Sequence, residues 1–196
     1  FAAMRYFADD RVGVVLGLLA LSFVVAGFVY GDTLDYPLTY DDYHQIRPYT
    51  SAEVIRTFLS NWDQSGIESR FYRPVTTVFY AIRFEVLGVN EGAYRFVSIA
   101  MFALAGTLLG WFVHAMTRNV TAAWLATALF VVHPSMPYAL VSWAANQMHL
   151  LSVLLVLGGM LWWCHVKERR GSRWMALLLV QVLLFLAKED GIMFGP

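Results

Sequence analysis

The run VGVVLGLLALSFVVAGFVY occupies residues 12–30 and contains no charged side chain, with Arg11 before it and Asp32 after it. About 20 apolar residues cross the hydrocarbon core of a bilayer as an α-helix, so we expect a membrane-spanning helix here. The run exceeds the about 7–15 apolar residues of a signal peptide, and no small-residue cleavage site follows it. We therefore expect a retained anchor rather than a cleaved leader.

The composition of the whole chain agrees with a membrane location. Of 196 residues, 59% are hydrophobic and 14% are charged, whereas soluble domains have about 25% charged residues. The formal net charge of +0 argues against a nucleic-acid partner. The single cysteine, Cys164, excludes an intrachain disulfide and a cysteine-based zinc site. The chain is thus expected to be an integral membrane protein.

Four more apolar stretches follow the first and complete the expected fold class, an all-α integral membrane protein with about five spans in one membrane domain over residues 1–196. They are residues 93–116, 119–132, 147–165 and 174–187. The third span is short, about 21 Å at 1.5 Å per residue. It either stops early or continues as a kinked helix through Pro134 and Pro137.

The positive charges predict the orientation of these spans. One set of loops and termini holds seven cations and three acids: Arg5, Arg11, Arg118, Lys167, Arg169, Arg170 and Arg173, with Asp9, Asp10 and Glu168. The long segment 31–92 on the other side holds nine acids and five basic residues. Short basic loops stay in the cytoplasm. We expect a bacterial-type cytoplasmic (inner) membrane, a cytoplasmic N terminus and an extracytoplasmic 31–92 segment.

The 31–92 segment is too polar to span a membrane and too long for a plain connector. Within it, residues 51–62 are expected to form a helix capped by Thr50 or Ser51. Residues 75–86 carry a second helical stripe of apolar side chains, but their charged residues argue against a central transmembrane position. We expect this second helix to lie at the membrane interface, within a small helical cap.

Two acidic residues, Asp41 and Asp42, stand about a dozen residues beyond the first span. On an extended stretch, neighbouring side chains point in opposite directions, so both carboxylates are not expected to hold one ion equally. One could act as a general base or metal ligand while the other anchors the loop. The alternative is a hydrated acidic loop without a chemical role.

Other polar residues are expected on the same outer side. Arg73 precedes Pro74 at the start of the interfacial helix, where it could hold a phosphate or extend to lipid headgroups. Lys188 and Glu189 end the last span, where charges usually pair or face water. His133 lies near the outer face, and helix-end hydrogen bonding is the simplest role for it. Acidic and basic groups that converge at one membrane face indicate a site; interfacial anchoring is the alternative.

The order of these motifs resembles that of the polytopic C-type glycosyltransferases that use polyprenyl-phosphate sugars, especially the protein O-mannosyltransferase-like branch. The resemblance covers nearly the whole chain and rests on Asp41-Asp42, Tyr72-Arg73-Pro74-Val75, Leu87-Gly88, His114, His133-Pro134, Trp143 with Leu150-Leu151-Ser152, and Lys188-Glu189. It implies the N-terminal half of that fold. The chain would be the N-terminal part of such an enzyme, or a shortened, degenerate member.

The resemblance also implies a reaction and a set of site residues. An acceptor hydroxyl would attack the anomeric carbon of a lipid-linked sugar at the outer membrane surface, with inversion, while the phosphate leaves. Asp41 or Asp42 would be the base, or would hold a divalent metal ion if one is used. Arg73 and Lys188 would bind the donor phosphate, with Glu189 and His133 in support. The implied partners are membrane lipid and a polyprenyl-phosphate sugar.

Two departures from the family pattern leave a second function open. Ala139, Gln147 and His149 stand where the family often has Glu, Arg and Asp. The chain also ends after about five spans, whereas such enzymes usually continue with several more. The alternative is a non-catalytic structural subunit, derived from this fold, that stabilises a larger membrane complex such as a respiratory or photosynthetic assembly.

Overall fold

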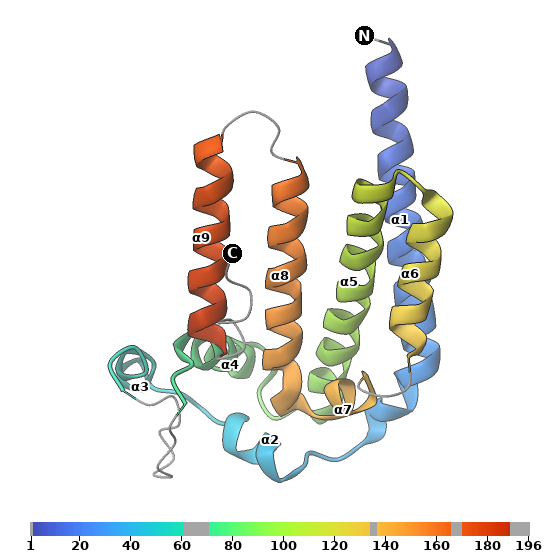
Figure 1. The fold of residues 1–196 in the computed structure, drawn as a ribbon. Helices are drawn as coiled ribbons and strands as arrows, with labels where there is room; N and C mark the ends of the chain where they lie inside the picture. Colours follow the sequence, from blue (N-terminus) through green and yellow to red (C-terminus); the bar gives the residue numbers. More distant parts are fainter. Residues whose placement is uncertain (1, 61–70, 134–136, 166–169, 189–196) are drawn as a thin grey trace.

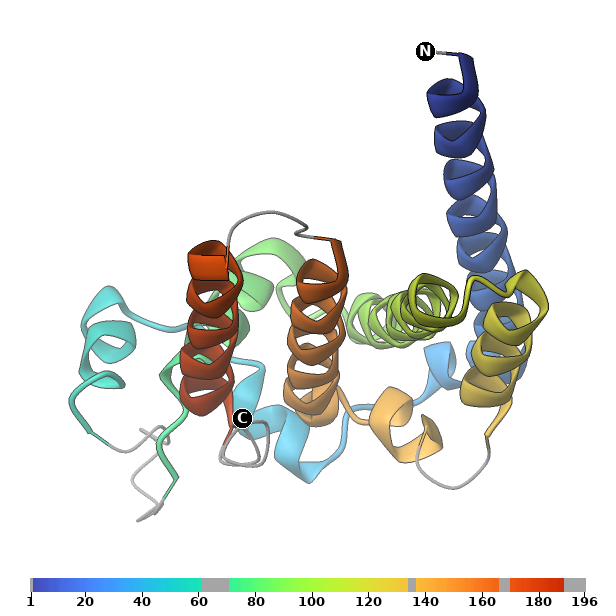
Figure 2. The same ribbon diagram turned by 45° about the horizontal axis from the view of Figure 1, so that its top comes forward.

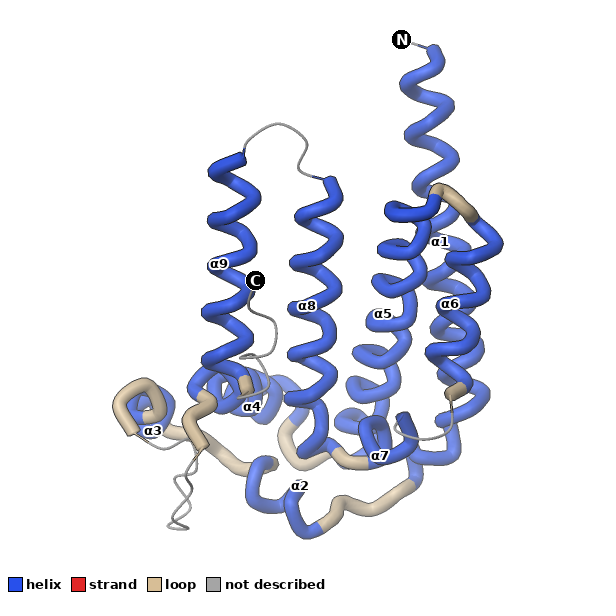
Figure 3. Tube along the Cα trace, viewed as in Figure 1, coloured by secondary structure: helices blue, strands red, loops and turns tan. Residues whose placement is uncertain are grey.

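The computed structural model describes residues 2–60, 71–133, 137–165 and 170–188, and every regular element in them is a helix (Figures 1 and 3). The all-α expectation is confirmed for these residues. The elements are α1 (Ala2–Tyr30), η1 (Gly31–Asp35), α2 (Tyr40–Gln45), α3 (Ser51–Arg56), α4 (Pro74–Leu87), α5 (Glu91–Thr117), α6 (Val120–Val132), α7 (Pro137–Ser142), η2 (Ala144–Asn146), α8 (Gln147–His165) and α9 (Arg170–Ala187).

The long helices form a bundle with α5 at its centre. Helix α5 packs against α1, α6 and α8, and α9 packs against the side of α8 (Figures 1 and 2). The end of α5, the start of α6, the end of α8 and the start of α9 all lie at one end of the bundle. Helices α2, α3, α4 and α7 lie at the other end, which we call the cap end.

Within the described residues, three helical segments are long and apolar enough to cross a membrane: Val12–Asp35, Glu91–Thr117 and Ala144–His165. They correspond to the first, second and fourth predicted spans. The third and fifth, Val120–Val132 and Trp174–Ala187, are apolar but shorter. The structure is therefore that of a helical protein suited to a membrane, with three candidate spans by length and composition. The count of five remains a prediction.

Local sequence signals account for the helix boundaries. The Asn90 and Asn119 side chains cap α5 and α6, because each accepts a hydrogen bond from a backbone N–H three residues on, at 3.1 Å. Between these helices, Arg118 adopts the left-handed conformation with φ 57°. Helix α6 ends at Val132, and His133 is extended (ψ 124°) as expected for a residue before proline. The described part of the third span thus stops early.

The predicted cap helices are present with changed bounds. Helix α3 begins at Ser51 after a capping box formed by Thr50 and Glu53. It ends at Arg56, earlier than predicted, and the predicted end at 61–62 lies outside the described residues. Helix α4 matches the predicted stripe and starts with Pro74, whose fixed φ suits the first turn. In Figure 1, α4 lies across the bundle near the end of α9 rather than parallel to it.

The core joins the bundle to its cap end. One apolar cluster comes from α1, α5, α6, α7 and α8, and its buried members are Ala26, Tyr30, Ile99, Phe102, Ala103, Val131, Val141 and Leu150. A second, smaller cluster joins Leu38 and Ile46 to Tyr94 and Ala144. This second cluster attaches the segment around α2 to α5 and η2, directly beside a buried polar network.

Candidate functional site

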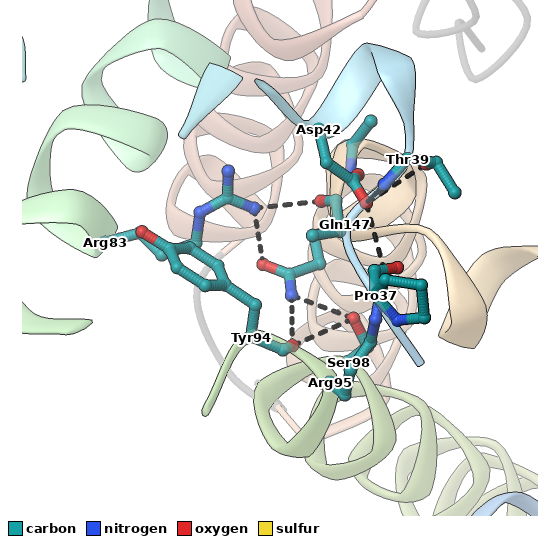
Figure 4. A network of polar contacts seen from close by, with 10 residues as sticks. Pro37, Thr39, Asp42, Arg83, Tyr94, Arg95, Ser98 and Gln147 are labelled. Atoms are coloured by element: carbon teal, nitrogen blue, oxygen red, sulfur yellow. Dashed lines mark hydrogen bonds and ion pairs between the residues drawn. The ribbon is translucent and has the colours of Figure 1, made fainter. Parts of the chain in front are cut away.

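Asp42 is fully buried at the junction of cap and bundle (Figure 4). Its Oδ2 lies 3.1 Å from Arg95 Nη2 of α5 and accepts from the Thr39 backbone N–H at 3.0 Å and the Thr39 hydroxyl at 3.1 Å. Its Oδ1 accepts from the Ala145 N–H at 2.8 Å. The sequence places this residue at the third position of α2, where a carboxylate completes a capping box. Asp42 therefore anchors α2 to α5 and η2.

Arg83 and Gln147 form the second half of the network. Arg83 Nη1 donates to the Ala144 carbonyl at 2.9 Å and to Gln147 Oε1 at 2.8 Å. Gln147 Nε2 donates to the Tyr94 carbonyl at 2.7 Å and to the Ser98 hydroxyl at 2.8 Å, as Figure 4 shows. Gln147 thus joins α8 to both α4 and α5.

Tyr80 and Arg83 are buried together on the inner side of α4. The Tyr80 hydroxyl donates to the Ala145 carbonyl at 2.7 Å, and the Arg83 guanidinium carbon lies 4.4 Å from the centre of the Tyr80 ring. Burial raises the pKa of the Tyr80 hydroxyl, so this residue stays neutral. Burial also lowers the pKa of Arg83 from its ordinary value. In the described residues no carboxylate forms an ion pair with Arg83, and the aromatic faces replace one.

The contacts of six consecutive residues, 144–149, bring the predicted cations together. Met148 and His149 follow the network residues at 144, 145 and 147. The Met148 Sδ lies 3.4 Å from Arg73 Nη1, and the His149 Nδ1 lies 3.1 Å from Lys188 Nζ. The Arg73 and Lys188 side chains are both buried. The Thr76 hydroxyl donates to the Ala187 carbonyl at 2.6 Å and holds the start of α4 against the end of α9. Arg73 and Lys188 therefore both contact the start of α8, at consecutive residues.

The other predicted site residues are placed differently. Asp41 is exposed on α2, next to the buried Asp42. His133 is exposed at the end of α6. Glu189 lies outside the described residues. Arg73 and Lys188 contact the start of α8, whereas Asp41 lies on the exposed side of α2.

A divalent metal does not fit the acidic pair. Both carboxylate oxygens of Asp42 are already bonded to a guanidinium and to backbone or hydroxyl donors, so neither is left to bind a metal ion. Asp41 alone offers a single carboxylate. Among the residues that the structure describes, no three His, Cys, Asp or Glu side chains lie close enough to hold a metal. We derive no step through a metal ion.

Sequence analysis missed the importance of Arg83, Arg95 and Gln147. Arg83 served only as evidence against a central membrane position, and Gln147 as a departure from a family pattern. The available signal was an arginine inside each of two otherwise apolar helices, since such residues face a protein interior and need a partner. Comparisons of the chain with models of protein families, with curated proteins and with solved structures found no match.

Proposed function

We propose that this chain is a glycosyltransferase-like membrane protein that binds the phosphate of a polyprenyl-phosphate sugar at its cap end. The observation behind the proposal is that Arg73 and Lys188 contact consecutive residues at the start of α8. Phosphate accepts charge-assisted hydrogen bonds from both kinds of side chain, so two cations at one end of the bundle suit a phosphate ligand.

The membrane placement that we propose has five spans, with the cap end outside and the N terminus in the cytoplasm of a bacterial-type inner membrane. Exposed aromatic side chains at both ends of the bundle support it, because tryptophan and tyrosine favour the two membrane interfaces. Trp162, Trp163 and Trp174 lie at the end opposite the cap, and Tyr72 and Trp143 lie towards the cap. The basic loops of the sequence belong to the first of these ends.

In the proposed reaction Asp41 is the base and Asp42 is a positioning residue. Asp41 is exposed, whereas both oxygens of Asp42 are occupied. The acceptor hydroxyl loses its proton to the Asp41 carboxylate while its oxygen bonds to the anomeric carbon. The bond from that carbon to the phosphate oxygen breaks, and the polyprenyl phosphate leaves with the electron pair. Arg73 and Lys188 stabilise the charge that develops on the phosphate.

A second candidate function is a non-catalytic subunit of a larger membrane complex. Two observations favour it. Both carboxylate oxygens of Asp42 are bonded in structural contacts, and the neutral Gln147 stands where the resembled glycosyltransferases often have a charged residue. In this reading the polar network joins the cap to the bundle and performs no chemistry. The two functions differ in whether the Arg73–Lys188 junction binds a phosphate.

The test measures binding of polyprenyl phosphate to the purified chain by native mass spectrometry, followed by transfer of sugar from a polyprenyl-phosphate sugar. Hydrogen bonds to charged groups contribute about 1.5–3 kcal/mol, so Arg73→Gln and Lys188→Gln should each weaken binding about tenfold or more. Arg56→Gln, which removes an exposed cation at the same end, is the matched control. Equal affinity in all four proteins would reject the phosphate site. Recovery of the wild-type chain in a fixed ratio with other subunits, without bound phosphate lipid, would favour the second function.

A further inference from the structure

On and after α3, several apolar side chains point outward while a threonine is buried. Thr57, which follows the helix, is fully buried and donates its hydroxyl to the Val54 carbonyl at 2.8 Å. The apolar side chains point outward instead: Leu59 is 85% exposed, Ile55 is 65% exposed and Phe58 is also exposed. A helix on a water-covered surface would bury the apolar residues and expose the threonine.

Helix α4 shows the same reversal over a longer stretch. Its buried residues include Thr76, Tyr80 and Arg83, each of which has a hydrogen bond to another element. Its outward residues Val86 and Ile82 are 74% and 60% exposed. The polar side of α4 therefore faces the protein, and its apolar side faces the surroundings.

The two reversed helices adjoin an apolar surface of the bundle. Helix α3 packs against α4, and the Tyr72 hydroxyl donates to the Phe58 carbonyl at 2.9 Å. Helix α4 in turn packs against α9, whose outward side chains are also apolar, among them Leu178, Val182 and Phe185. Apolar side chains are thus exposed both on α9 and on the neighbouring α4 of the cap.

One charged residue limits how deep this surface can lie. Glu85 is exposed on α4, within a turn of Ile82 and Val86. A carboxylate is costly in the hydrocarbon core, but a helix in the interface plane buries its apolar face only about 5–10 Å into the boundary between headgroups and acyl chains. At that depth Ile82 and Val86 contact acyl chains while Glu85 reaches the headgroup region.

We propose that α3 and α4 are an interfacial anchor whose outward apolar side chains insert into the phospholipid leaflet at the cap end. The occupant of this surface is lipid, because the surface adjoins the exposed apolar side chains of α9 and because the buried Thr57, Thr76 and Tyr80 each donate a hydrogen bond inside the protein. This inference rests on the proposed membrane placement but not on the proposed phosphate site, since an anchored cap serves a transferase and a structural subunit equally.

The experiment places a fluorescent probe on this surface. In a Cys164→Ser background, Leu59→Cys and Val86→Cys are each labelled with a small environment-sensitive fluorophore, and the chain is reconstituted in phosphatidylcholine vesicles. Asp35→Cys, at an exposed polar position at the end of the first candidate span, is the control. For each probe, fluorescence quenching is measured with three quenchers: lipid brominated at a shallow acyl position, lipid brominated at a deep acyl position, and iodide in the aqueous phase.

We expect the probes at residues 59 and 86 to be quenched at least twofold more by shallow brominated lipid than by iodide, and the probe at residue 35 to show the opposite order. Stronger quenching by iodide at residues 59 and 86 would overturn the proposal, because water would then cover the surface. Shielding from both quenchers would also overturn it, because another protein surface, such as a second copy of the chain, would be the occupant. Two probe sites, one after α3 and one on α4, guard against a local folding defect.

Discussion

Asp42 and Arg95 form an ion pair at 3.1 Å in which neither side chain is exposed. The pair joins α2 of the cap to α5 at the centre of the bundle, over 53 residues of sequence. Arg95 also donates to the Pro37 carbonyl at 2.7 Å, so a single guanidinium fixes both ends of the segment that leads into α2. The cap is therefore attached to the bundle through charge as well as through apolar contact.

Removing one partner of this pair should destabilise the protein strongly. Asp42→Asn leaves Arg95 charged and buried without its carboxylate, and breaking a buried pair in this way costs about 3–5 kcal/mol. Asp41→Asn, at the exposed neighbouring position, should cost less than about 0.5 kcal/mol. The measurement is the free energy of unfolding in detergent micelles. Equal stability of the two variants would show that the Asp42–Arg95 pair does not hold the cap.

Close packing of α5 against α6 gives a second prediction. A Cβ at Gly110 would overlap the Thr127 hydroxyl and lie 3.1 Å from the Ala123 carbonyl, which is backbone and cannot move away easily. Gly110→Ala should therefore destabilise the bundle by about 1–3 kcal/mol. Gly158→Ala in α8 is the matched control, because a Cβ there meets nothing within 4 Å and alanine favours the helix. The prediction fails if both variants melt at the wild-type temperature.

The sequence predicted the parts of this fold that depend on local signals. The apolar run at 147–165 coincides with α8, and Thr50, one of the two predicted caps, precedes α3, since both signals lie within or beside the segment that they shape. The network could not be predicted in the same way. Whether Arg83 meets Gln147, 64 residues away, depends on how α4 crosses the bundle, and no local pattern contains that information.

The candidate site was also predicted only as far as local signals and topology allow. Arg73 and Lys188 were predicted on one side of the membrane from topology, and the structure brings them to neighbouring residues of α8. The sequence predicted that Asp41 and Asp42 have different roles but not which role belongs to which residue, because a pair of adjacent acids does not reveal which one faces inward. The capping box at Thr39 decides this, since the third residue of α2 is Asp42.

Glu53 should make the start of α3 sensitive to acid. Its carboxylate accepts from the Thr50 backbone N–H at 2.7 Å, and this bond, followed by further contacts with Thr50 and Arg47, lowers the pKa of Glu53. A carboxylate whose pKa is lower in the folded state stabilises the fold at pH values above its unfolded-state pKa. That stabilisation is lost as the pH falls through the folded-state pKa. The protection of the α3 amides against hydrogen exchange, relative to their intrinsic rates, should therefore fall below the ordinary pKa of glutamate. In Glu53→Gln the exchange of α3, corrected for intrinsic rates, should not change over that pH range; a matching acid response would assign the effect to another group.

Gln147 should be the neutral residue whose loss costs most, because its amide joins three elements at once. It donates to the Tyr94 carbonyl and the Ser98 hydroxyl of α5, and it accepts from Arg83 of α4. Gln147→Leu fills a similar volume but leaves Arg83 with the Ala144 carbonyl as its remaining acceptor. Unsatisfied buried groups cost about 1–3 kcal/mol each, and more when they are charged, so we expect a loss of about 2–4 kcal/mol.

The control for Gln147→Leu is Ser152→Ala on the same helix. The Ser152 hydroxyl donates to the Met148 carbonyl one turn earlier, within α8, so its removal should cost less than about 1 kcal/mol. Limited proteolysis within the α3–α4 region distinguishes the two variants further, because loss of the Gln147 contact frees α4 from α8. Faster cleavage there in Gln147→Leu, with the long helices intact, is expected if the network holds the cap. Uniform cleavage along the whole chain would instead mean that the bundle itself depends on Gln147.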